Sequence, residues 1–299
     1  MLEILCYNDF MKKILTFLVF VLFSFNPSYA IKIGLQTNVN KIGIGASTEA
    51  VLVDANLHKT ICPINAMKGY ELRPYKNKIA IKYDGKYYKI DSDNIVLKTL
   101  ENGFVSAKRK WYRGILIIQN KNGKLTVIND IDIESYIKGV LPSEMPSSWE
   151  SEALKAQAIA ARSYALANLG KRANYGYDLY DTPEDQAYGG ASSETQKTNE
   201  IVDNTKGLVL TYDLKIIPAY YFASAGGHSV SASKAWGSDL PFIRSVPSYD
   251  GHVKKNGHGV GMSQHGANNL AKKGYNAYQI LQYFYKNIKF ARINPQYYN

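Results

Sequence analysis

The sequence predicts an α+β protein, and three observations lead to that class. Short apolar stretches separated by turn residues fill much of the first third of the chain, a pattern typical of β-strands. An alanine-rich, apolar stretch near the middle has the composition of a buried helix. Strand and helix signals then alternate without the regular rhythm of βαβ units, so an α+β fold is expected rather than a parallel α/β sheet.

The first thirty residues have the features of a signal peptide. Lys12 and Lys13 form a basic segment, the run from Ile14 to Phe25 is apolar, and Ser28 and Ala30 supply the small residues of a cleavage site. A run of about twelve residues is short for a transmembrane helix, which needs roughly 20. We therefore expect export to the periplasm, cell wall or exterior, with membrane contact only if residues 1–30 stay uncleaved.

Composition and charge narrow the class of partner. The chain has 299 residues, 45% hydrophobic and 20% charged, which is ordinary for a globular protein. Its two cysteines are Cys6, inside the predicted signal peptide, and Cys62, so the mature chain has no internal disulfide and no cysteine-rich zinc site. The net charge of +11 favours anionic envelope polymers. Export and the lack of a recognisable nucleic-acid-binding motif argue against DNA or RNA.

The strand signals define a β-rich N-terminal region, residues 31–110. The dipeptide Asp84-Gly85, and Asn122-Gly123 further on, are typical of tight hairpin turns between strands. A second domain is expected over residues 111–290, followed by a short tail, 291–299. No chemical motif is recognisable within 31–110, so its role is open at this stage.

The helical signals begin after residue 131. A short helix is expected over 132–140, with Pro142 and Pro146 then interrupting the chain. Ser147 and Glu150 have capping-box spacing and predict a buried helix from about residue 149 to 169. The patterns that follow predict helices over 194–204 and 276–285 and strands over 207–212 and 218–223.

Glu144 is the strongest candidate for a catalytic residue. It lies between Pro142 and Pro146, with Leu141 and Met145 as apolar neighbours. Restricted backbone and apolar surroundings would desolvate the carboxyl group and raise its pKa, as a general acid requires near neutral pH. The alternative is an acidic residue stabilised by the positive end of the following helix. The neighbouring residues alone do not distinguish these two interpretations.

Lys155 and Arg162 are the second feature. Seven residues apart, they lie on one face of the alanine-rich helix, which also carries Gln157 and Ser163. Burying cations is costly without partners, so this face is expected to line a cleft or a polar network. The alternative is a solvated stripe on a surface helix.

The third feature is a glycine-rich stretch over residues 257–266 that contains His258 and Gln264. It lacks the ending of a phosphate-binding loop and does not match a dinucleotide fingerprint. No histidine pairing typical of zinc hydrolases is present, so no metal is expected. A serine-hydrolase arrangement would join Ser224 or Ser263 to His258 and Asp250, but no nucleophile-elbow motif supports it.

Taken together, these segments resemble the SpoIID/LytB (stage II sporulation protein D) family. Five blocks fall in the family's order: Ile137–Pro146 with Glu152–Ala165, Asp185–Gly190, Tyr220–Gly227, Ala235–Gly237 and Gly257–Gly266. The resemblance covers about residues 110–290. It implies a peptidoglycan lytic transglycosylase, a lyase associated with sporulation, that favours glycan strands stripped of stem peptides and works beside an amidase.

The resemblance also implies roles for residues. Glu144 is the expected catalytic acid, and Lys155 and Arg162 are expected to act in substrate binding, where they could hold the lactyl carboxylate of denuded muramic acid. The matching blocks suggest further substrate contacts from Gln157, Tyr188, Ser224, His258 and Gln264. The cysteines that hold a metal in some members are missing here, so neither a metal nor a cofactor is expected.

Two other functions fit the same residues. The chain could be a non-catalytic module that binds peptidoglycan glycan and recruits or stimulates an N-acetylmuramoyl-L-alanine amidase (an amidase enhancer), with residues 31–110 as the natural partner surface. It could also be an envelope scaffold with a decayed site, although the intact Glu144, Lys155 and Arg162 argue against that reading.

Overall fold

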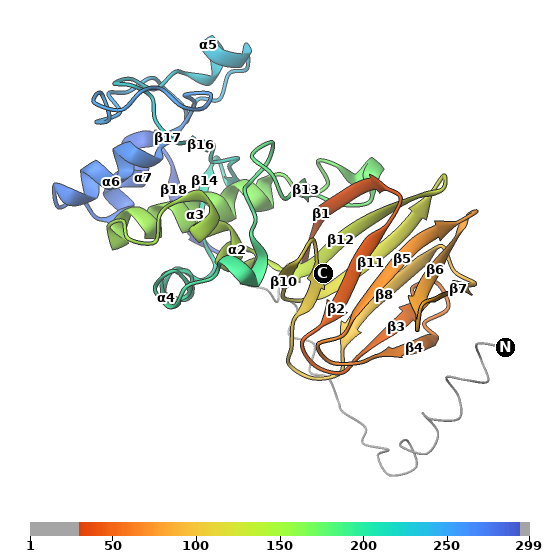
Figure 1. Cartoon of the computed structure of the whole chain (residues 1–299). Helices are drawn as coiled ribbons and strands as arrows, with labels where there is room; N and C mark the ends of the chain where they lie inside the picture. Colours follow the sequence, from red (N-terminus) through yellow and green to blue (C-terminus); the bar gives the residue numbers. More distant parts are fainter. Residues whose placement is uncertain (1–29, 294–299) are drawn as a thin grey trace. The chain divides into compact units, whose positions relative to one another are not determined.

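The computed structural model describes residues 30–293 and divides into two compact units (Figure 1). The first ends at Asp132 and the second begins at Ile133. The mixture of helices and separate sheets confirms the predicted α+β class. The predicted signal peptide, apart from Ala30, and the end of the predicted tail lie outside the described residues. Among residues 30–293, no helix is both long and apolar enough to cross a membrane.

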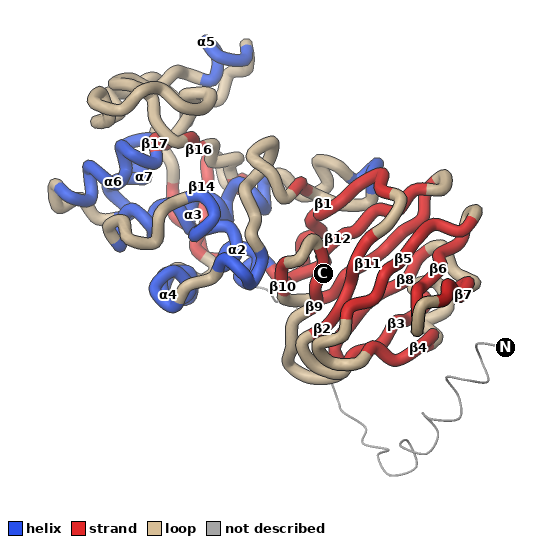
Figure 2. Tube along the Cα trace, viewed as in Figure 1, coloured by secondary structure: helices blue, strands red, loops and turns tan. Residues whose placement is uncertain are grey.

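The N-terminal unit is built from strands, which Figure 2 shows in red. One sheet has the order β1-β12-β11-β8-β3-β4, and a second has the order β10-β9-β2-β5-β6-β7. Every pair within these two runs is antiparallel. The strands are β1 (Ala30–Val39), β2 (Ile42–Ala46), β3 (Ala50–Asp54), β4 (Thr60–Ile64), β5 (Gly69–Tyr75), β6 (Lys78–Tyr83), β7 (Lys86–Ile90), β8 (Asn94–Thr99), β9 (Val105–Ala107), β10 (Lys110–Tyr112), β11 (Ile115–Lys121) and β12 (Lys124–Asp132).

Alternation of buried and exposed residues follows from the strand period of two. In β11, for example, Leu116 and Ile118 are fully buried while their neighbours are partly exposed. Asn120 at the end of this strand donates to the carbonyl of Lys76, in the hairpin of the other sheet, at 3.0 Å. The buried faces of the two sheets therefore form the core of this unit.

The two hairpin turns predicted from sequence are confirmed. Asp84 and Gly85 join β6 to β7 with φ of 46° and 81°, and Asn122 and Gly123 join β11 to β12 with φ of 53° and 74°. Such consecutive positive φ values belong to the tight turns that match strand twist. β11 pairs with β8, and β12 pairs with β1. The first compact unit therefore extends to Asp132, beyond the end of the predicted region 31–110.

The second unit consists mainly of helices, with short strands between them. β14 pairs antiparallel with β15 and β18, and β16 pairs parallel with β17. The elements are α2 (Ile133–Glu144), α3 (Ser151–Ala167), the 3-10 helix η1 (Ala173–Tyr175), β13 (Leu179–Tyr180), the 3-10 helix η2 (Gly190–Ser193), α4 (Gln196–Asn204), β14 (Leu208–Tyr212), β15 (Lys215–Ile216), β16 (Tyr221–Phe222), α5 (Ala232–Trp236), β17 (Met262–Ser263), α6 (Gln264–Lys272), α7 (Ala277–Phe284) and β18 (Lys289–Arg292).

Helix α3 is the centre of this unit, as its composition predicted. From Ala153 to Leu166 every residue except Lys155 is buried, and the helix contacts α2, α4, α6, α7 and β14. Its alanines let these neighbours approach closely. The predicted capping box is wrong, however: the helix begins at Ser151, and its N-cap residue, Glu150, makes no side-chain capping bond.

Helix α2 also departs from the prediction. It does not stop before Pro142 but runs through it to Glu144, so Glu144 ends one helix rather than preceding the next. Glu144 therefore lies seven residues before the first residue of α3, outside the first turn of that helix. Pro142 removes one helical N–H and crowds the carbonyl one turn earlier, and the packing of buried residues such as Tyr136 and Leu141 keeps the helix intact.

Helix α6 was not predicted, because its first turn lies inside the glycine-rich stretch. Ser263 caps it by accepting from the Gly266 N–H at 3.0 Å. Gly266 itself packs against backbone: a Cβ there would lie 2.0 Å from the Ser248 carbonyl oxygen. One of the glycines in this stretch thus serves close packing of a helix, in addition to loop geometry.

Candidate active site

Glu144 is held at the end of α2 by donors from two other segments. The Ala187 N–H donates to Oε1 at 2.6 Å, and the Gln264 side chain donates from Nε2 to Oε2 at 3.3 Å. The Tyr221 hydroxyl is a further hydrogen-bond partner of the carboxyl group. Residues far apart in sequence, on α2, the 186–190 segment, β16 and α6, therefore converge on one carboxyl group.

The surroundings of Glu144 favour its protonated form. Burial raises the pKa of the Glu144 carboxyl above its ordinary value, and the hydrogen bonds from Ala187, Gln264 and Tyr221 offset this only in part. A carboxyl group with a raised pKa retains a proton that it can donate closer to neutral pH. The raised pKa that the sequence predicted for Glu144 is thus present in the structure.

The segment that carries Ala187 is fixed against α2 by Gly139. The Gly139 carbonyl accepts hydrogen bonds from the Gly189 N–H at 3.2 Å and from the Ser193 hydroxyl at 3.0 Å. A Cβ at position 139 would lie 2.5 Å from the Tyr188 ring, so only glycine permits this approach. Gly139 therefore determines how closely the Ala187 N–H can approach Glu144.

The buried side chain of Gln186 and the phenols of Tyr136 and Tyr221 form a hydrogen-bonded group next to Glu144. Gln186 donates from Nε2 to the Tyr221 hydroxyl at 2.8 Å and to the Ala161 carbonyl at 3.2 Å, and it accepts from the Tyr136 hydroxyl at 3.2 Å. Burial raises the pKa of both Tyr136 and Tyr221 well above the ordinary value, so both phenols keep their protons. Gln186 and Tyr221 belong to the matching blocks and Tyr136 directly precedes one, but the sequence did not assign these three residues to the site.

Asp185 is a second carboxyl group near these tyrosines. It accepts from Lys171 Nζ at 2.6 Å and from Arg172 Nε at 2.7 Å, and its side chain is fully buried. Burial alone would raise the pKa of Asp185, but the bonds from Arg172, Lys171 and the Tyr180 N–H outweigh it, so the pKa is lowered. Asp185 is therefore an ionised structural carboxylate, in contrast to Glu144.

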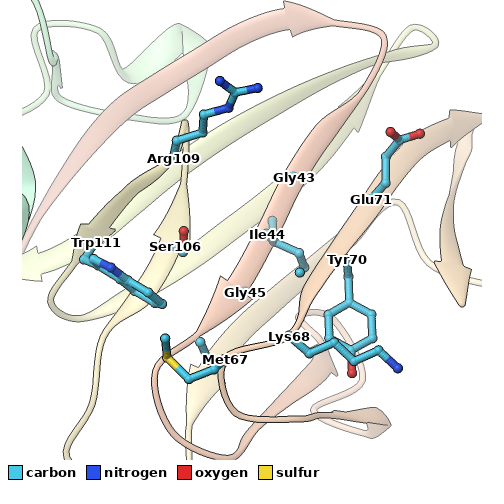
Figure 3. Close-up of a pocket in the computed structure, with 12 residues that line it drawn as sticks. Gly43, Ile44, Gly45, Met67, Lys68, Tyr70, Glu71, Ser106, Arg109 and Trp111 are labelled. Carbon is cyan, nitrogen blue, oxygen red and sulfur yellow. The ribbon is translucent and has the colours of Figure 1, made fainter.

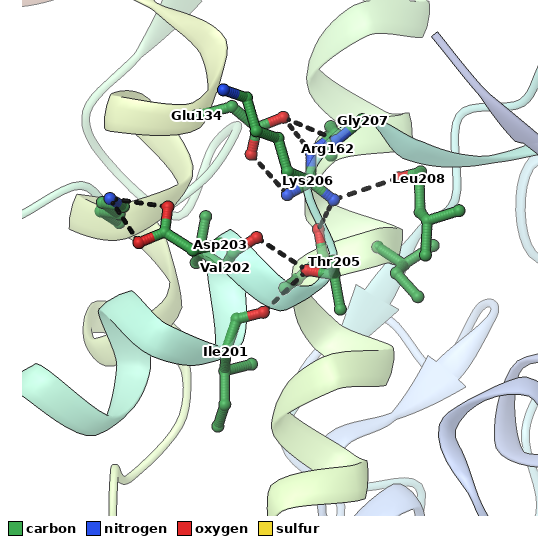
Figure 4. Close-up of polar contacts among 12 residues, drawn as sticks. Glu134, Arg162, Ile201, Val202, Asp203, Thr205, Lys206, Gly207 and Leu208 are labelled. Carbon is green, nitrogen blue, oxygen red and sulfur yellow. Dashed lines mark hydrogen bonds and ion pairs between the residues drawn. The ribbon is translucent and has the colours of Figure 1, made fainter.

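Arg162 lies in a buried polar network rather than at a substrate surface. Its side chain is fully buried and donates to both carboxylate oxygens of Glu134, at 2.9 and 2.7 Å, and to the Leu208 carbonyl at 3.1 Å (Figure 4). Glu134 also accepts from the Gly207 N–H at 3.0 Å. Arg162 thus joins α3, α2 and β14 in a polar network, one of the two surroundings expected for this face of the helix. The side chain is buried and offers no surface to a ligand, contrary to the expected substrate contact.

Lys155 is partly exposed and belongs to a separate pair. Its ammonium group lies 2.6 Å from Glu152 Oε1, and the other oxygen of Glu152 accepts from the Ala277 N–H at the start of α7, at 2.8 Å. Gln157, two residues after Lys155, is fully buried, and its amide makes no hydrogen bond within the described residues. The two predicted cations therefore do not form one binding surface.

Two further predicted contacts are buried. Tyr188 packs its ring 4.9 Å from Tyr136 and is 3% exposed. Ser224 is 1% exposed, and its hydroxyl donates to the Lys254 carbonyl at 2.6 Å. Their burial indicates structural roles.

His258 belongs to an aromatic group beside the site. Its ring lies 5.3 Å from Trp236, 5.6 Å from Phe222 and 6.3 Å from Tyr220. Its Nδ1 accepts from the Val260 N–H at 3.0 Å. Loss of hydration against these rings lowers the pKa of His258, although the residue retains an exposed edge. Trp236 is 43% exposed, so the group has an aromatic surface open to solvent.

The serine-hydrolase arrangement is wrong. Ser263 donates to the buried carboxylate of Asp250 at 2.5 Å, and the Ala225 and Gly227 N–H groups donate to the same carboxylate at 2.7 and 2.9 Å. Burial would raise the pKa of Asp250, but these bonds and one from Ser248 lower it. No histidine stands between a serine and this acid among the described residues, so Asp250 organises loops rather than activating a nucleophile.

Candidate metal ligands do not gather in the part of the chain that the structure describes, where no three His, Cys, Asp or Glu side chains lie close enough to hold an ion. The polar groups around Glu144 are instead amides and phenols. The arrangement can donate and accept a proton at one carboxyl group and can supply hydrogen bonds to its ionised form.

The chain is similar to known proteins over the region that contains Glu144. Residues 121–212 match the family described as "SpoIID: Stage II sporulation protein". The chain is 34% identical over 186 residues to an uncharacterised protein of Brachyspira hyodysenteriae, covering 61% of this chain and 49% of that protein. It is 42% identical over 107 residues to the amidase enhancer of Bacillus subtilis, covering 36% and 14%.

A further match is the stage II sporulation protein D of Bacillus subtilis, at 35% identity over 136 residues, which covers 40% of each chain. The present chain therefore spans about half or less of the length of the curated relatives it matches. The residues matched by the family include Glu144 and the Ala187 N–H that holds it.

Proposed function

We propose that this chain, whose residues 121–212 match the SpoIID family, acts on the bacterial cell wall as a lytic transglycosylase of peptidoglycan. The observation that carries the proposal is a single carboxyl group, Glu144, with a pKa raised by burial and with donors already in place for its ionised form. The preferred substrate is glycan stripped of stem peptides.

The proposed reaction needs one acid/base. Glu144 donates its proton to the glycosidic oxygen as the bond from that oxygen to the muramyl C1 breaks. The resulting carboxylate accepts the proton of the same sugar's 6-hydroxyl, whose oxygen bonds to C1 and closes the anhydro ring. No water is consumed, and Glu144 returns to its protonated state. Ordinary glycosidases need a second carboxylate; Asp185, paired with Lys171 and Arg172, is not available for that role.

Substrate contacts in this proposal come from groups that retain exposure. Lys155 is a candidate partner for a lactyl carboxylate, since about a third of its side chain is exposed. Trp236 and His258 offer aromatic surface for a sugar ring. Gln264 is assigned to Glu144 itself. Arg162, Tyr188 and Ser224 are assigned to the fold, on the evidence of their burial.

The test is digestion of denuded peptidoglycan by the wild type and by Glu144→Gln, with product masses measured. Wild type should release anhydro-muramyl products, and Glu144→Gln should lose about 10²- to 10⁴-fold in rate while remaining folded. Glu150→Gln is the matched control, because the exposed Glu150 side chain makes no capping bond, and it should retain activity. Wild type that gives no anhydro sugars would exclude the activity.

The second candidate is a non-catalytic glycan-binding module that stimulates a cell-wall amidase. The similarity to a protein named amidase enhancer favours it. Addition of the wild type and of Glu144→Gln to an amidase acting on cell walls separates the two. Equal stimulation by both proteins, without anhydro products from either, would support this alternative.

Export to the cell envelope belongs to the same proposal. It rests on the sequence of residues 1–30 and on the basic charge of the chain. Mass measurement of the protein recovered from the producing cells would test it, since cleavage after Ala30 gives a defined N-terminus.

A further inference from the structure

The second sheet of the N-terminal unit has a hollow on its outer face, with a volume of about 420 Å³ (Figure 3). Strand register brings four of its residues into one row across four strands. Gly69 on β5 lies opposite Gly45 on β2, Gly45 lies opposite Ser106 on β9, and Ser106 lies opposite Trp111 on β10. The floor of the hollow is therefore almost bare backbone, with an indole at one end.

The space above two of its glycines, Gly43 and Gly69, is empty, whereas a Cβ on Gly45 would lie 3.0 Å from the Lys68 carbonyl oxygen. A Cβ placed on Gly43 or on Gly69 would meet no atom of the described chain within 4 Å, and neither glycine has a positive φ. Nothing in the local backbone therefore requires glycine at these two positions. Glycine inside a strand weakens it, and its occurrence often marks a place where a ligand or another chain approaches the backbone.

The walls combine aromatic, apolar and cationic groups. In Figure 3, Trp111 and Arg109 lie on one side of the bare strand, and Lys68 and Glu71 lie on the other. Met67 adds an apolar side chain that is 73% exposed. This combination suits a ligand that has both an apolar ring face and polar or charged substituents.

The charge of the rim is positive. Arg109 makes no ion pair within the described residues and lies between Lys108 and Lys110 in the β9–β10 turn. Glu71, the acidic group of the hollow, is already engaged by Arg73 Nε at 2.8 Å and by Lys41 Nζ at 3.9 Å. Lys68 lies 3.7 Å from Asp84, so the unpaired charge that faces a ligand is that of Arg109, and it complements an anion.

We propose that this hollow is a second glycan-binding site, which takes a sugar chain bearing carboxylate groups. A sugar ring would lie over the bare strand against the face of Trp111, and a carboxylate substituent would meet Arg109 or Lys68. Recognition of a peptide by strand addition uses a sheet edge, whereas the hollow lies on a face. The identity of the polymer, muramic-acid-containing glycan, rests on the proposed function; the existence of the site does not.

Gly43→Val, which fills part of the hollow, tests the proposed binding site. Gly43→Val in the full chain places a side chain in the empty space, and valine is favoured in strands, so stability should be equal or higher. Both proteins also carry Glu144→Gln, so that the probe is not consumed. The probe is a soluble muramic-acid-containing oligosaccharide without stem peptides. Its affinity should fall by at least about tenfold in Gly43→Val.

The signal should come from the site itself. The chain has three tryptophans, so 5-fluorotryptophan labelling gives three ¹⁹F resonances, and Trp111→Phe assigns one of them. The oligosaccharide should shift the Trp111 resonance in the Gly43 protein and not in Gly43→Val. Arg109→Gln should weaken this response, while Lys98→Gln, which removes an exposed cation from β8 in the other sheet, should not.

Each other outcome overturns the proposal. An unchanged Trp111 resonance, or equal oligosaccharide affinity in Gly43→Val, excludes the site. The proposed enzyme activity is tested separately, by the products of the protein with Glu144 intact. An equal response to a neutral N-acetylglucosamine oligomer excludes recognition of carboxylate. A response to free stem peptide but not to glycan makes the hollow a peptide site instead.

Discussion

The Arg162 guanidinium donates two hydrogen bonds to the carboxylate of Glu134, 28 residues earlier in the chain, at 2.9 and 2.7 Å. The arginine side chain is fully buried and that of the glutamate is 14% exposed. A planar guanidinium and a carboxylate in this two-bond geometry form one of the stronger charged contacts in proteins. The pair joins the first two helices of the C-terminal unit ahead of β14.

Removal of one member of this pair should be costly. Arg162→Met leaves Glu134 without its main partner, and we expect a loss of about 3–5 kcal/mol in the free energy of unfolding. Lys155→Met, which breaks a half-exposed pair on the same helix, should cost about 0–1 kcal/mol. Urea denaturation measures both. A stable Arg162→Met protein with lost glycan affinity would instead restore a substrate role for Arg162.

Neutralising Glu144 should stabilise the fold. The folded-state pKa of Glu144 is raised, so ionisation favours the unfolded chain as pH rises from about 4 through that raised pKa. Above this window the wild type bears the full cost of a buried carboxylate, which Glu144→Gln avoids. The melting temperature of Glu144→Gln should exceed that of the wild type at pH 7.5, and the difference should vanish near pH 4. Glu150→Gln should show no such pH-dependent difference.

The pKa of Glu144 should respond to Gln264. The side-chain bond from Gln264 lowers this pKa, against the effect of burial, so Gln264→Leu should raise it further. Titration of the Glu144 carboxyl by ¹³C NMR measures the shift directly, and in an active enzyme the alkaline limb of the rate profile should move to higher pH. Gln282→Leu, on the exposed side of α7, should leave the titration unchanged. A lowered pKa in Gln264→Leu would contradict the assignment.

Gly139 should be intolerant of even a methyl group. In Gly139→Ala the new Cβ would lie 2.5 Å from the Tyr188 ring and 3.1 Å from the Gly190 carbonyl oxygen, so the 186–190 segment must move away from α2. We expect a loss of about 1–3 kcal/mol in stability. The Ala187 amide proton should also lose the NMR shift of a short bond to Glu144. Gly251→Ala, whose Cβ would meet only the Gly227 Cα at 3.8 Å, is the control and should behave as wild type.

The sequence predicted correctly those structural features that a few adjacent residues determine. The hairpin turns at Asp84-Gly85 and Asn122-Gly123 require particular residue types, and the composition of α3 required burial. Glu144 was recognisable because its neighbours are apolar or proline. These features depend on a few adjacent residues, which is why they could be predicted.

Other parts of the site could not be predicted, because they depend on distant contacts. Arg162 was taken for a substrate group since nothing in its own helix reveals Glu134 as its partner. The Ala187 donor is a backbone N–H, which leaves no trace in residue type. The capping pattern at Ser147 and Glu150 was misleading, because α3 starts one residue after Glu150 without using it.

The bond from Ala187 makes the two oxygens of Glu144 chemically unequal. A backbone amide can only donate, so Oε1 must present a lone pair to it at 2.6 Å whether the carboxyl group is charged or neutral. Because the Gln264 donor is more distant, at 3.3 Å, Oε2 is the weaker acceptor and the favoured place for the proton of the acid form. In the proposed reaction the same oxygen atom both releases and recovers the proton. The departing glycosidic oxygen and then the 6-hydroxyl must each approach the same edge of the carboxyl group. This requirement limits how the sugar can rotate between proton donation and ring closure.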